Sequence, residues 1–237
     1  MTYLDYRRIA EIDSTTFQNQ KPYPWVNPDG LLTEAGYRRL LDTLPDVSLF
    51  ETRFGMRRAH GQQSHDRYVL EYHDSLNVPE PWKEFIAELL AKEYQGFLRR
   101  LLGVRSLEIN FHWHYTPNGC SVSPHCDAKH KLGSHIFYFN TEGDWDSTWG
   151  GETVILDDGG RFTRKSAPQF KDFDQEIASQ ALGNFSLLFA RKGRSWHGVR
   201  EIRCPPDRLR KVFIIVINRL TAVDRFRRFM GKAPAGY

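Results

Sequence analysis

Two hydrophobic patterns divide the chain into a helical first part and a β-rich second part. Apolar side chains between residues 79 and 102 recur at steps of three and four, the period of a helix with one buried face. Residues 33–44 show the same spacing, which starts at Thr33, a residue type that caps helices, and stops before Pro45. The pattern therefore predicts helices over 33–44 and 79–102.

After Gly103 the hydrophobic period changes from the helical value to two. Apolar and aromatic side chains alternate with polar ones along residues 107–115, which is typical of a half-buried strand. Further β-type runs are separated by clusters of Gly, Asp and Pro, and occupy residues 135–140, 151–156, 185–190 and 212–218. Because no clear helical pattern separates these runs, an antiparallel sandwich or barrel fits better than a sheet built from βαβ units.

The length and charge of the chain indicate one globular domain. Its 237 residues can bury a sizeable core, and no internal repeat or low-complexity linker divides them. A net charge of +4 is too mild to indicate a nucleic-acid partner, so we expect none. We expect a single domain over 1–237, with a helical N-terminal support over 1–103, a β-barrel core over 104–220 and a C-terminal tail over 221–237.

The cysteines and the N-terminus favour a cytoplasmic protein. Cys120, Cys126 and Cys204 are odd in number and follow no paired spacing, so a disulfide framework is not expected. The N-terminus has no apolar signal region, and no run of apolar residues is long enough to cross a bilayer. We therefore expect a soluble chain with no membrane partner.

The segment PHCDAKH, residues 124–130, contains two residues typical of a metal site. In extended backbone, His125 and Asp127 would point to one side while Cys126 points away. The pair alone is a weak signal, because a hydrogen-bonded surface turn often contains it. A third ligand is available in His197, on a later strand that a barrel could bring beside the first. Two histidines and one carboxylate form the facial set that holds Fe(II) and leaves three coordination sites open.

Six ordered pieces of sequence between Tyr115 and Asn218 resemble the prolyl-hydroxylase-like branch of the 2-oxoglutarate- and Fe(II)-dependent dioxygenases. They are a tyrosine before a glycine loop, the His-x-Asp pair, the strand FYFN, an Asp-Trp turn leading to Gly-Gly-Glu, the histidine of SWHGV and a basic residue opening RLRKVFIIVI. The resemblance implies a mainly β fold with flanking helices: a double-stranded β-helix, that is, a jelly-roll or cupin-like barrel, buttressed by N-terminal α-helices.

The resemblance also implies a set of cofactor contacts. His125, Asp127 and His197 would be the catalytic metal ligands, and 2-oxoglutarate would chelate the iron. The far carboxylate of 2-oxoglutarate needs a buried cation, which a guanidinium matches with two hydrogen bonds. Arg210 fits best, because it lies two positions before Val212, where the family usually has a small residue. Arg208 and Lys211 stay open as alternatives.

Two tyrosines match family positions near the cosubstrate. Tyr138 corresponds to the residue whose hydroxyl assists in binding the far carboxylate, and Tyr115 to the tyrosine that lines the pocket near the iron. For both, the alternative is a core aromatic residue with a satisfied hydroxyl. If Tyr115 faces the pocket, strand alternation turns His112 and His114 out of the barrel interior.

Other polar and aromatic residues carry open interpretations. His130 and His135 could touch substrate or support the iron ligands. Trp145 and Trp149 are expected to pack rather than to bind substrate. The Arg- and His-containing stretch over 53–75 is either a mobile flap over the pocket or an ordinary solvated loop.

The resemblance implies an enzyme that uses Fe(II), the cosubstrate 2-oxoglutarate and O2, with ascorbate as a stimulant. It would hydroxylate an aliphatic C–H of a prolyl, amino-acid-type or other small-molecule or peptidyl substrate, forming succinate and CO2. The retained Asp127 favours hydroxylation, with desaturation or ring closure as alternatives. A non-oxidative cupin-like isomerase or hydrolase, or a vestigial binding or sensing module, also fits a three-ligand barrel. The sequence does not identify the substrate.

Overall fold

Two facing antiparallel sheets form the core of the structure, a computed structural model that describes residues 1–56, 58 and 61–220. Within these residues the larger sheet has seven strands, in the order β1-β9-β6-β11-β4-β3-β2, and the smaller has four, in the order β5-β10-β7-β8. Their bounds are β1 (Trp25–Val26), β9 (Ser186–Ala190), β6 (Lys131–Tyr138), β11 (Leu209–Arg219), β4 (Leu107–Pro117), β3 (Arg67–Glu71), β2 (Glu51–Arg53), β5 (Val122–His125), β10 (Trp196–Val199), β7 (Val154–Asp157) and β8 (Gln175–Ala178). The predicted double-stranded β-helix is confirmed; the predicted tail over 221–237 lies outside the described residues.

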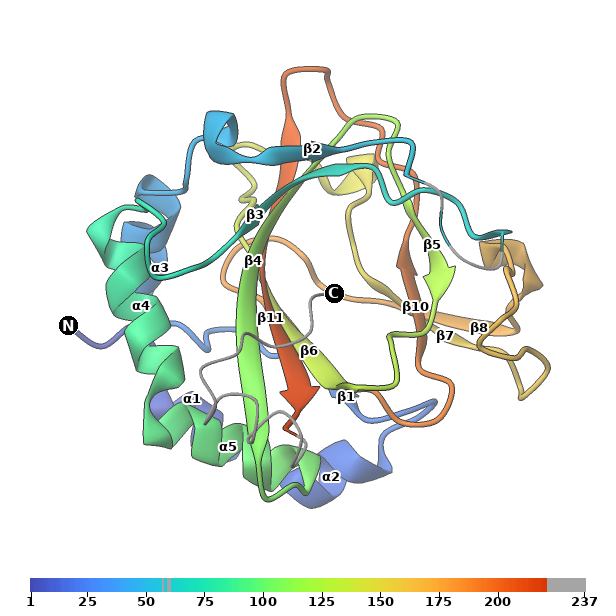
Figure 1. The fold of residues 1–237 in the computed structure, drawn as a ribbon, viewed down its shortest axis with the longest axis horizontal. Helices are drawn as coiled ribbons and strands as arrows, with labels where there is room; N and C mark the ends of the chain where they lie inside the picture. Colours follow the sequence, from blue (N-terminus) through green and yellow to red (C-terminus); the bar gives the residue numbers. More distant parts are fainter. Residues whose placement is uncertain (57, 59–60, 221–237) are drawn as a thin grey trace.

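Helices cover one side of the larger sheet, and the smaller sheet faces its other side (Figure 1). The helices are α1 (Tyr6–Glu11), α2 (Ser14–Asn19), α3 (Glu34–Asp42), α4 (Glu80–Leu90) and α5 (Lys92–Leu102), with short 3-10 turns η1 (Val47–Leu49), η3 (Ser147–Trp149) and η4 (Phe170–Asp172). In the described part of the chain, no helix is long and apolar enough to cross a bilayer.

The helix predicted over 33–44 is confirmed, and the one predicted over 79–102 is two separate helices. Thr33 caps α3, where its Oγ1 accepts a hydrogen bond from the Gly36 amide at 3.1 Å. The single helix expected over 79–102 is wrong, because the backbone at Ala91 is extended, with ψ of 162°, and separates α4 from α5. The apolar spacing widens to five residues between Leu89 and Tyr94, so the break lets both buried stripes face the same core.

The sequence predicted five of the strands and missed the others. The five predicted β runs correspond to β4, β6, β7, β9 and β11. The remaining strands have two to five residues each and lack the apolar runs that mark β7 and β9, which are equally short.

Aromatic packing fills the space between the helices and the larger sheet. The ring centroid of Trp82, on α4, lies 5.1 Å from each of those of Trp113, Phe139 and Phe213. Trp113 and Phe213 come from β4 and β11, so the central strands are fixed from the helical side. The side chains on their other face point toward the smaller sheet, where the candidate site lies.

Candidate active site

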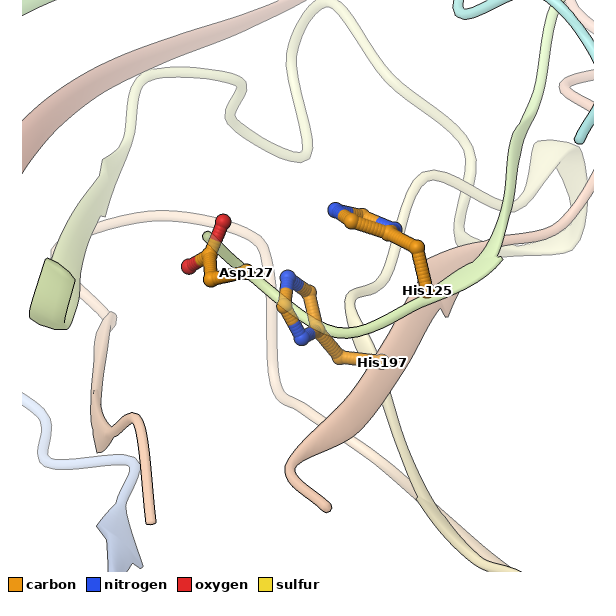
Figure 2. A group of neighbouring side chains, drawn as sticks. All are labelled: His125, Asp127 and His197. Atoms are coloured by element: carbon orange, nitrogen blue, oxygen red, sulfur yellow. The ribbon is translucent and has the colours of Figure 1, made fainter. Parts of the chain in front are cut away.

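Strand register brings the predicted metal ligands together. On the smaller sheet, β5 pairs with β10 so that His125 lies opposite His197, with ring centroids 4.4 Å apart. Asp127 lies just beyond the end of β5, and ligand atoms of all three residues lie within 4.8 Å of one another. Figure 2 shows the three side chains turned toward a common point.

Each histidine presents one ring nitrogen to this point. The Nδ1 of His125 lies 3.0 Å from the carbonyl oxygen of Ser123, and the Nδ1 of His197 lies 3.0 Å from that of Ser195. A carbonyl oxygen only accepts, so each Nδ1 carries the hydrogen and each Nε2 keeps a free lone pair. Metal-binding imidazoles are oriented by hydrogen bonds of this kind.

The electrostatics of the cluster favour a carboxylate between two neutral rings. Burial raises the pKa of Asp127, but the Lys131 ammonium, 2.9 Å away, and the two histidines lower the pKa below its usual range. Ser134 donates a further hydrogen bond at 3.4 Å. Burial lowers the pKa of both His125 and His197. The resulting donor set, two neutral imidazoles and a carboxylate, fits Fe(II).

A cavity of about 500 Å³ lies beside the three ligands, and it is lined by residues of both sheets. Arg210, only 7% exposed, enters this cavity from β11; its Nε donates to the Gly151 carbonyl, and its Nη2 lies 3.4 Å from the Thr153 hydroxyl. Of the three basic candidates only Arg210 lines the cavity. Lys211 instead pairs with Asp144 at 3.0 Å, and Arg208 with Asp207 at 3.5 Å.

The Gly-Gly-Glu turn makes room for this guanidinium. Gly151 has a φ of +103°, a conformation that side chains rarely adopt, and a Cβ there would lie 3.3 Å from Cδ of Arg210 and 3.4 Å from the Trp145 ring. Trp145 packs against Trp149, Ile202 and Cys204, as its expected packing role requires.

Tyr138 lies next to Arg210 in the core between the sheets. The guanidinium carbon of Arg210 lies 5.8 Å from the centroid of the Tyr138 ring. The tyrosine hydroxyl hydrogen-bonds to the hydroxyls of Thr153, at 3.0 Å, and Ser179, at 2.9 Å. Tyr138 is thus tied through Thr153 to the residue predicted to hold the far carboxylate.

The predicted pocket position of Tyr115 is wrong. Its ring stacks on Phe50 with centroids 4.3 Å apart, and its hydroxyl donates to the Pro45 carbonyl at 3.0 Å, on the helical side of the sheet. Its neighbours His114 and Thr116 line the cavity instead. The polar face of β4, not the aromatic face, is the one turned toward the iron ligands.

The stretch over 53–75 contributes directly to the cavity, although its sequence pattern left a flap and a loop open. Side chains of this stretch that line it are Arg53, Met56, Arg58, His65 and Arg67. The His65 ring centroid lies 4.7 Å from that of His125, and burial, followed by Arg58, lowers the pKa of His65 to about 3. Arg57 and His60, in the same stretch, lie outside the described residues.

His135, which follows the metal motif in the sequence, lies away from it. Its ring packs on the helical side of β6, where Nδ1 is 2.7 Å from the Tyr94 hydroxyl. A role beside the iron is therefore excluded for His135.

Comparison with known proteins connects this geometry to a family. Residues 111–216 match the sequence model of the 2OG-Fe(II) oxygenase superfamily, and this span contains all three predicted metal ligands and Arg210. No curated protein sequence matches the chain.

Several solved structures share the fold. A prolyl-4-hydroxylase from Pseudomonas putida is 14% identical, with a TM-score of 0.58 over 88% of this chain and 99% of that one. A prolyl hydroxylase from Trichoplax adhaerens, in complex with a peptide fragment of the hypoxia inducible factor oxygen degradation domain, is 11% identical, with a TM-score of 0.61 over 95% and 94%. SnoK, a non-heme alpha ketoglutarate dependent carbocyclase from nogalamycin biosynthesis, is 12% identical, with a TM-score of 0.61 over 97% and 96%.

The matched span carries the residues that the superfamily's cofactors need, and the surrounding chain has the corresponding barrel. The oxygenase interpretation therefore prevails over the non-oxidative and vestigial alternatives. Residues 111–216 match the 2OG-Fe(II) oxygenase superfamily and the chain folds like its prolyl hydroxylases, which supports an enzyme of the dioxygenase type with Fe(II) and 2-oxoglutarate as its cofactors.

Proposed function

We propose that this enzyme hydroxylates an aliphatic C–H of a prolyl, amino-acid-type or other small-molecule or peptidyl substrate, with succinate and CO2 as coproducts. His125, Asp127 and His197 would hold Fe(II), and Arg210 would hold the far carboxylate of 2-oxoglutarate. One observation carries the proposal: the free nitrogens of two neutral histidines and an ionised carboxylate meet in the cavity that a buried guanidinium also enters.

The protein's own groups would fix the positions of the reactants. When bound, iron and 2-oxoglutarate supply the activation of O2. The carbonyls of Ser123 and Ser195 hold the imidazoles in one orientation, and Lys131 keeps Asp127 ionised. Arg210 would bind a carboxylate through two parallel hydrogen bonds, which fixes its direction as well as its place.

The similarities give the proposal its substrate class. The barrel is shared with two prolyl hydroxylases, one of which is described in complex with a peptide fragment. Ring closure is a second candidate outcome, supported by the similarity to the carbocyclase SnoK. Mass spectrometry of the product separates the two reactions, because hydroxylation adds an oxygen atom and ring closure removes two hydrogens.

The test is O2 uptake and succinate formation by purified enzyme supplied with Fe(II), 2-oxoglutarate and ascorbate. We expect both signals to depend on Fe(II) and on 2-oxoglutarate, to rise with ascorbate, and to disappear in His197→Ala. His73→Ala is the matched control, because His73 is an exposed histidine outside the cavity. Uptake that persists without 2-oxoglutarate, or that survives in His197→Ala, would overturn the proposal.

A further inference from the structure

Besides the guanidinium group of Arg210, the cavity contains two more, those of Arg58 and Arg67. Arg58 and Arg67 both line it, and neither has an ion-pair partner among the residues that the structure describes. The Nε of Arg67 is buried with no hydrogen-bond partner, while its Nη1 donates to the His65 carbonyl at 2.6 Å. Buried donors and charges of this kind are costly unless something pairs with them.

Apart from Arg210, the other cations at the cavity wall are already paired. Arg53 bonds to Glu51 at 3.0 Å and to Glu71 at 3.1 Å, and Lys131 bonds to Asp127 at 2.9 Å. The pairing of these two cations shows that the chain neutralises charge where it is structural. In contrast, neither Arg58 nor Arg67 forms an ion pair within the described part of the chain.

Repulsion between like charges adds to the imbalance. Burial, followed by the neighbouring charges of Arg53 and Arg58, lowers the pKa of Arg67 to about 10. The charges of Asp66 and Glu71 raise the pKa of Arg67, and that of Asp127 raises the pKa of Arg58, but both values stay below the usual range. Two cations held together without a paired carboxylate destabilise the fold, so their presence in the cavity points to a ligand that neutralises them.

Sheet order separates this pair from the site proposed for 2-oxoglutarate. Arg67 lies on β3 and Arg210 on β11, and these strands flank β4. Two interstrand steps correspond to about 10 Å, and the β4 residues His114 and Thr116 line the cavity between the two strands. This spacing of the two strands leaves room for two anion subsites rather than one.

Binding of iron and 2-oxoglutarate would not neutralise the charges of Arg58 and Arg67. On the proposed function, one carboxylate of 2-oxoglutarate and Asp127 lie against the iron, and the other carboxylate lies against Arg210. Arg58 and Arg67 then still lack an ion-pair partner among the described residues. His65, which contacts both of these arginines, has its ring 4.7 Å from that of His125, so the second subsite reaches the edge of the metal centre.

We propose that Arg58 and Arg67 bind a carboxylate of the substrate, so that the enzyme acts on a carboxylate-bearing molecule whose apolar part faces the iron ligands. This inference rests on the proposed function. A carboxylate offers one oxygen to each guanidinium, and aliphatic side chains such as Ile136, Ile214 and Val216 line the same cavity and suit an apolar body.

Isothermal titration calorimetry on the anaerobic enzyme, loaded with Fe(II) and 2-oxoglutarate, tests this with three probes on one ring: benzoate, benzamide and phenyl phosphate. We expect benzoate to bind at least about tenfold more tightly than benzamide, and Arg58→Gln and Arg67→Gln each to remove about tenfold of benzoate affinity, since a charge-assisted hydrogen bond is worth about 1.5–3 kcal/mol. Arg161→Gln is the matched control, because it removes the same charge from an exposed ion pair with Asp174.

A stability measurement supplies a second readout. Because Arg67 is a half-buried cation beside like charges, with an unpaired buried Nε, we expect Arg67→Gln to raise the thermal midpoint of the ligand-free protein while it weakens benzoate binding. A purely structural arginine would give the opposite shift, and that result would overturn the inference.

The remaining outcomes separate this inference from the proposed function. Equal binding of benzoate and benzamide, or tighter binding of phenyl phosphate than of benzoate, overturns the carboxylate subsite and leaves 2-oxoglutarate-dependent O2 uptake standing. Loss of 2-oxoglutarate binding in Arg58→Gln or Arg67→Gln would show that these arginines bind the cosubstrate, and this result also overturns the carboxylate subsite for the substrate. If benzoate binds as expected but no O2 uptake occurs, the proposed hydroxylase function is wrong, and the proposal that Arg58 and Arg67 bind a substrate is wrong with it.

Discussion

The two faces of the larger sheet are built from the same strands but differ in what they hold. On β4, Trp113 and Tyr115 point into a closely packed set of rings under the helices. Their neighbours His114 and Thr116 point into the cavity. On β11, Phe213 joins the rings and Arg210 enters the cavity.

This difference shows how the fold supports an unfavourable set of charges. The helical face buries large apolar side chains, which stabilise the central strands and fix their positions. The other face can then keep a cationic cavity that would be destabilising by itself. Substitutions on the helical face should change stability, and substitutions on the cavity face should change binding and turnover.

The largest effect is expected from removal of a metal ligand. Asp127→Ala deletes the carboxylate of the donor set, so we expect succinate formation to fall by roughly a thousandfold or more, equivalent to about 4 kcal/mol of barrier. Bound iron should be lost as well, which metal analysis of the purified protein measures. If the variant kept one iron per chain and its activity, the assignment of binding and turnover to the cavity face would be contradicted.

A large change on the opposite face should leave the chemistry intact. The Phe213 ring lies 4.9 Å from the Trp113 ring and 5.1 Å from the Trp82 ring, centroid to centroid. Phe213→Ala should lower the free energy of unfolding by about 3–5 kcal/mol, measured by urea denaturation. Turnover per folded molecule should match the wild type below the transition. A loss of turnover without a loss of stability would contradict the comparison.

An intermediate effect is expected at Arg210. In Arg210→Lys a single ammonium replaces the forked guanidinium, so the affinity for 2-oxoglutarate should fall by about 1.5–3 kcal/mol, roughly tenfold to over a hundredfold. Calorimetry with 2-oxoglutarate measures this loss, and the free energy of unfolding should change little. Lys211→Gln is the adjacent control, and an equal loss there would show that the wrong cation has been assigned.

A pH-dependent effect is expected from a buried histidine on the helical face. Burial lowers the pKa of His135 to about 3, against about 6.5 in an unfolded chain. The unfolded state therefore binds the proton more readily, and the stability due to this residue is lost as pH falls from about 6.5 toward about 3, by up to about 1.4 kcal/mol per pH unit.

His135→Gln removes this titration but retains a hydrogen-bonding group for Tyr94. Urea denaturation at a series of pH values should show a shallower acid loss of stability in the variant than in the wild type. Parallel curves for the two proteins would show that His135 does not stay neutral in the folded state.

The sequence was most informative where a spacing or an ordered motif specifies the chemistry. The spacing of His125 and Asp127, with His197 later in the motif order, was sufficient to identify the cluster that β5 and β10 bring together. The barrel itself followed from the alternating runs and from the family resemblance. The break at Ala91 did not, because alanine there carries no helix-stopping signal and only the tertiary core requires it.

The residues whose positions the sequence did not predict correctly also have physical explanations. Alternation along β4 shows that its two faces differ, but not which face lies toward the metal, and so Tyr115 was misplaced. The sequence favoured Arg210 but kept Lys211 as an alternative, and the structure pairs Lys211 with Asp144 instead. Arg58 belongs to a stretch without a periodic pattern, so only its position in space reveals its part in the cavity.

The most direct test of the central claim is a crystal structure of the enzyme grown anaerobically with Fe(II) and 2-oxoglutarate, with anomalous data collected at the iron edge. We expect one anomalous peak bonded to Nε2 of His125, Nε2 of His197 and the Asp127 carboxylate, with the far carboxylate of 2-oxoglutarate on Arg210. An iron peak elsewhere, or 2-oxoglutarate lying against Arg58 and Arg67, would contradict it.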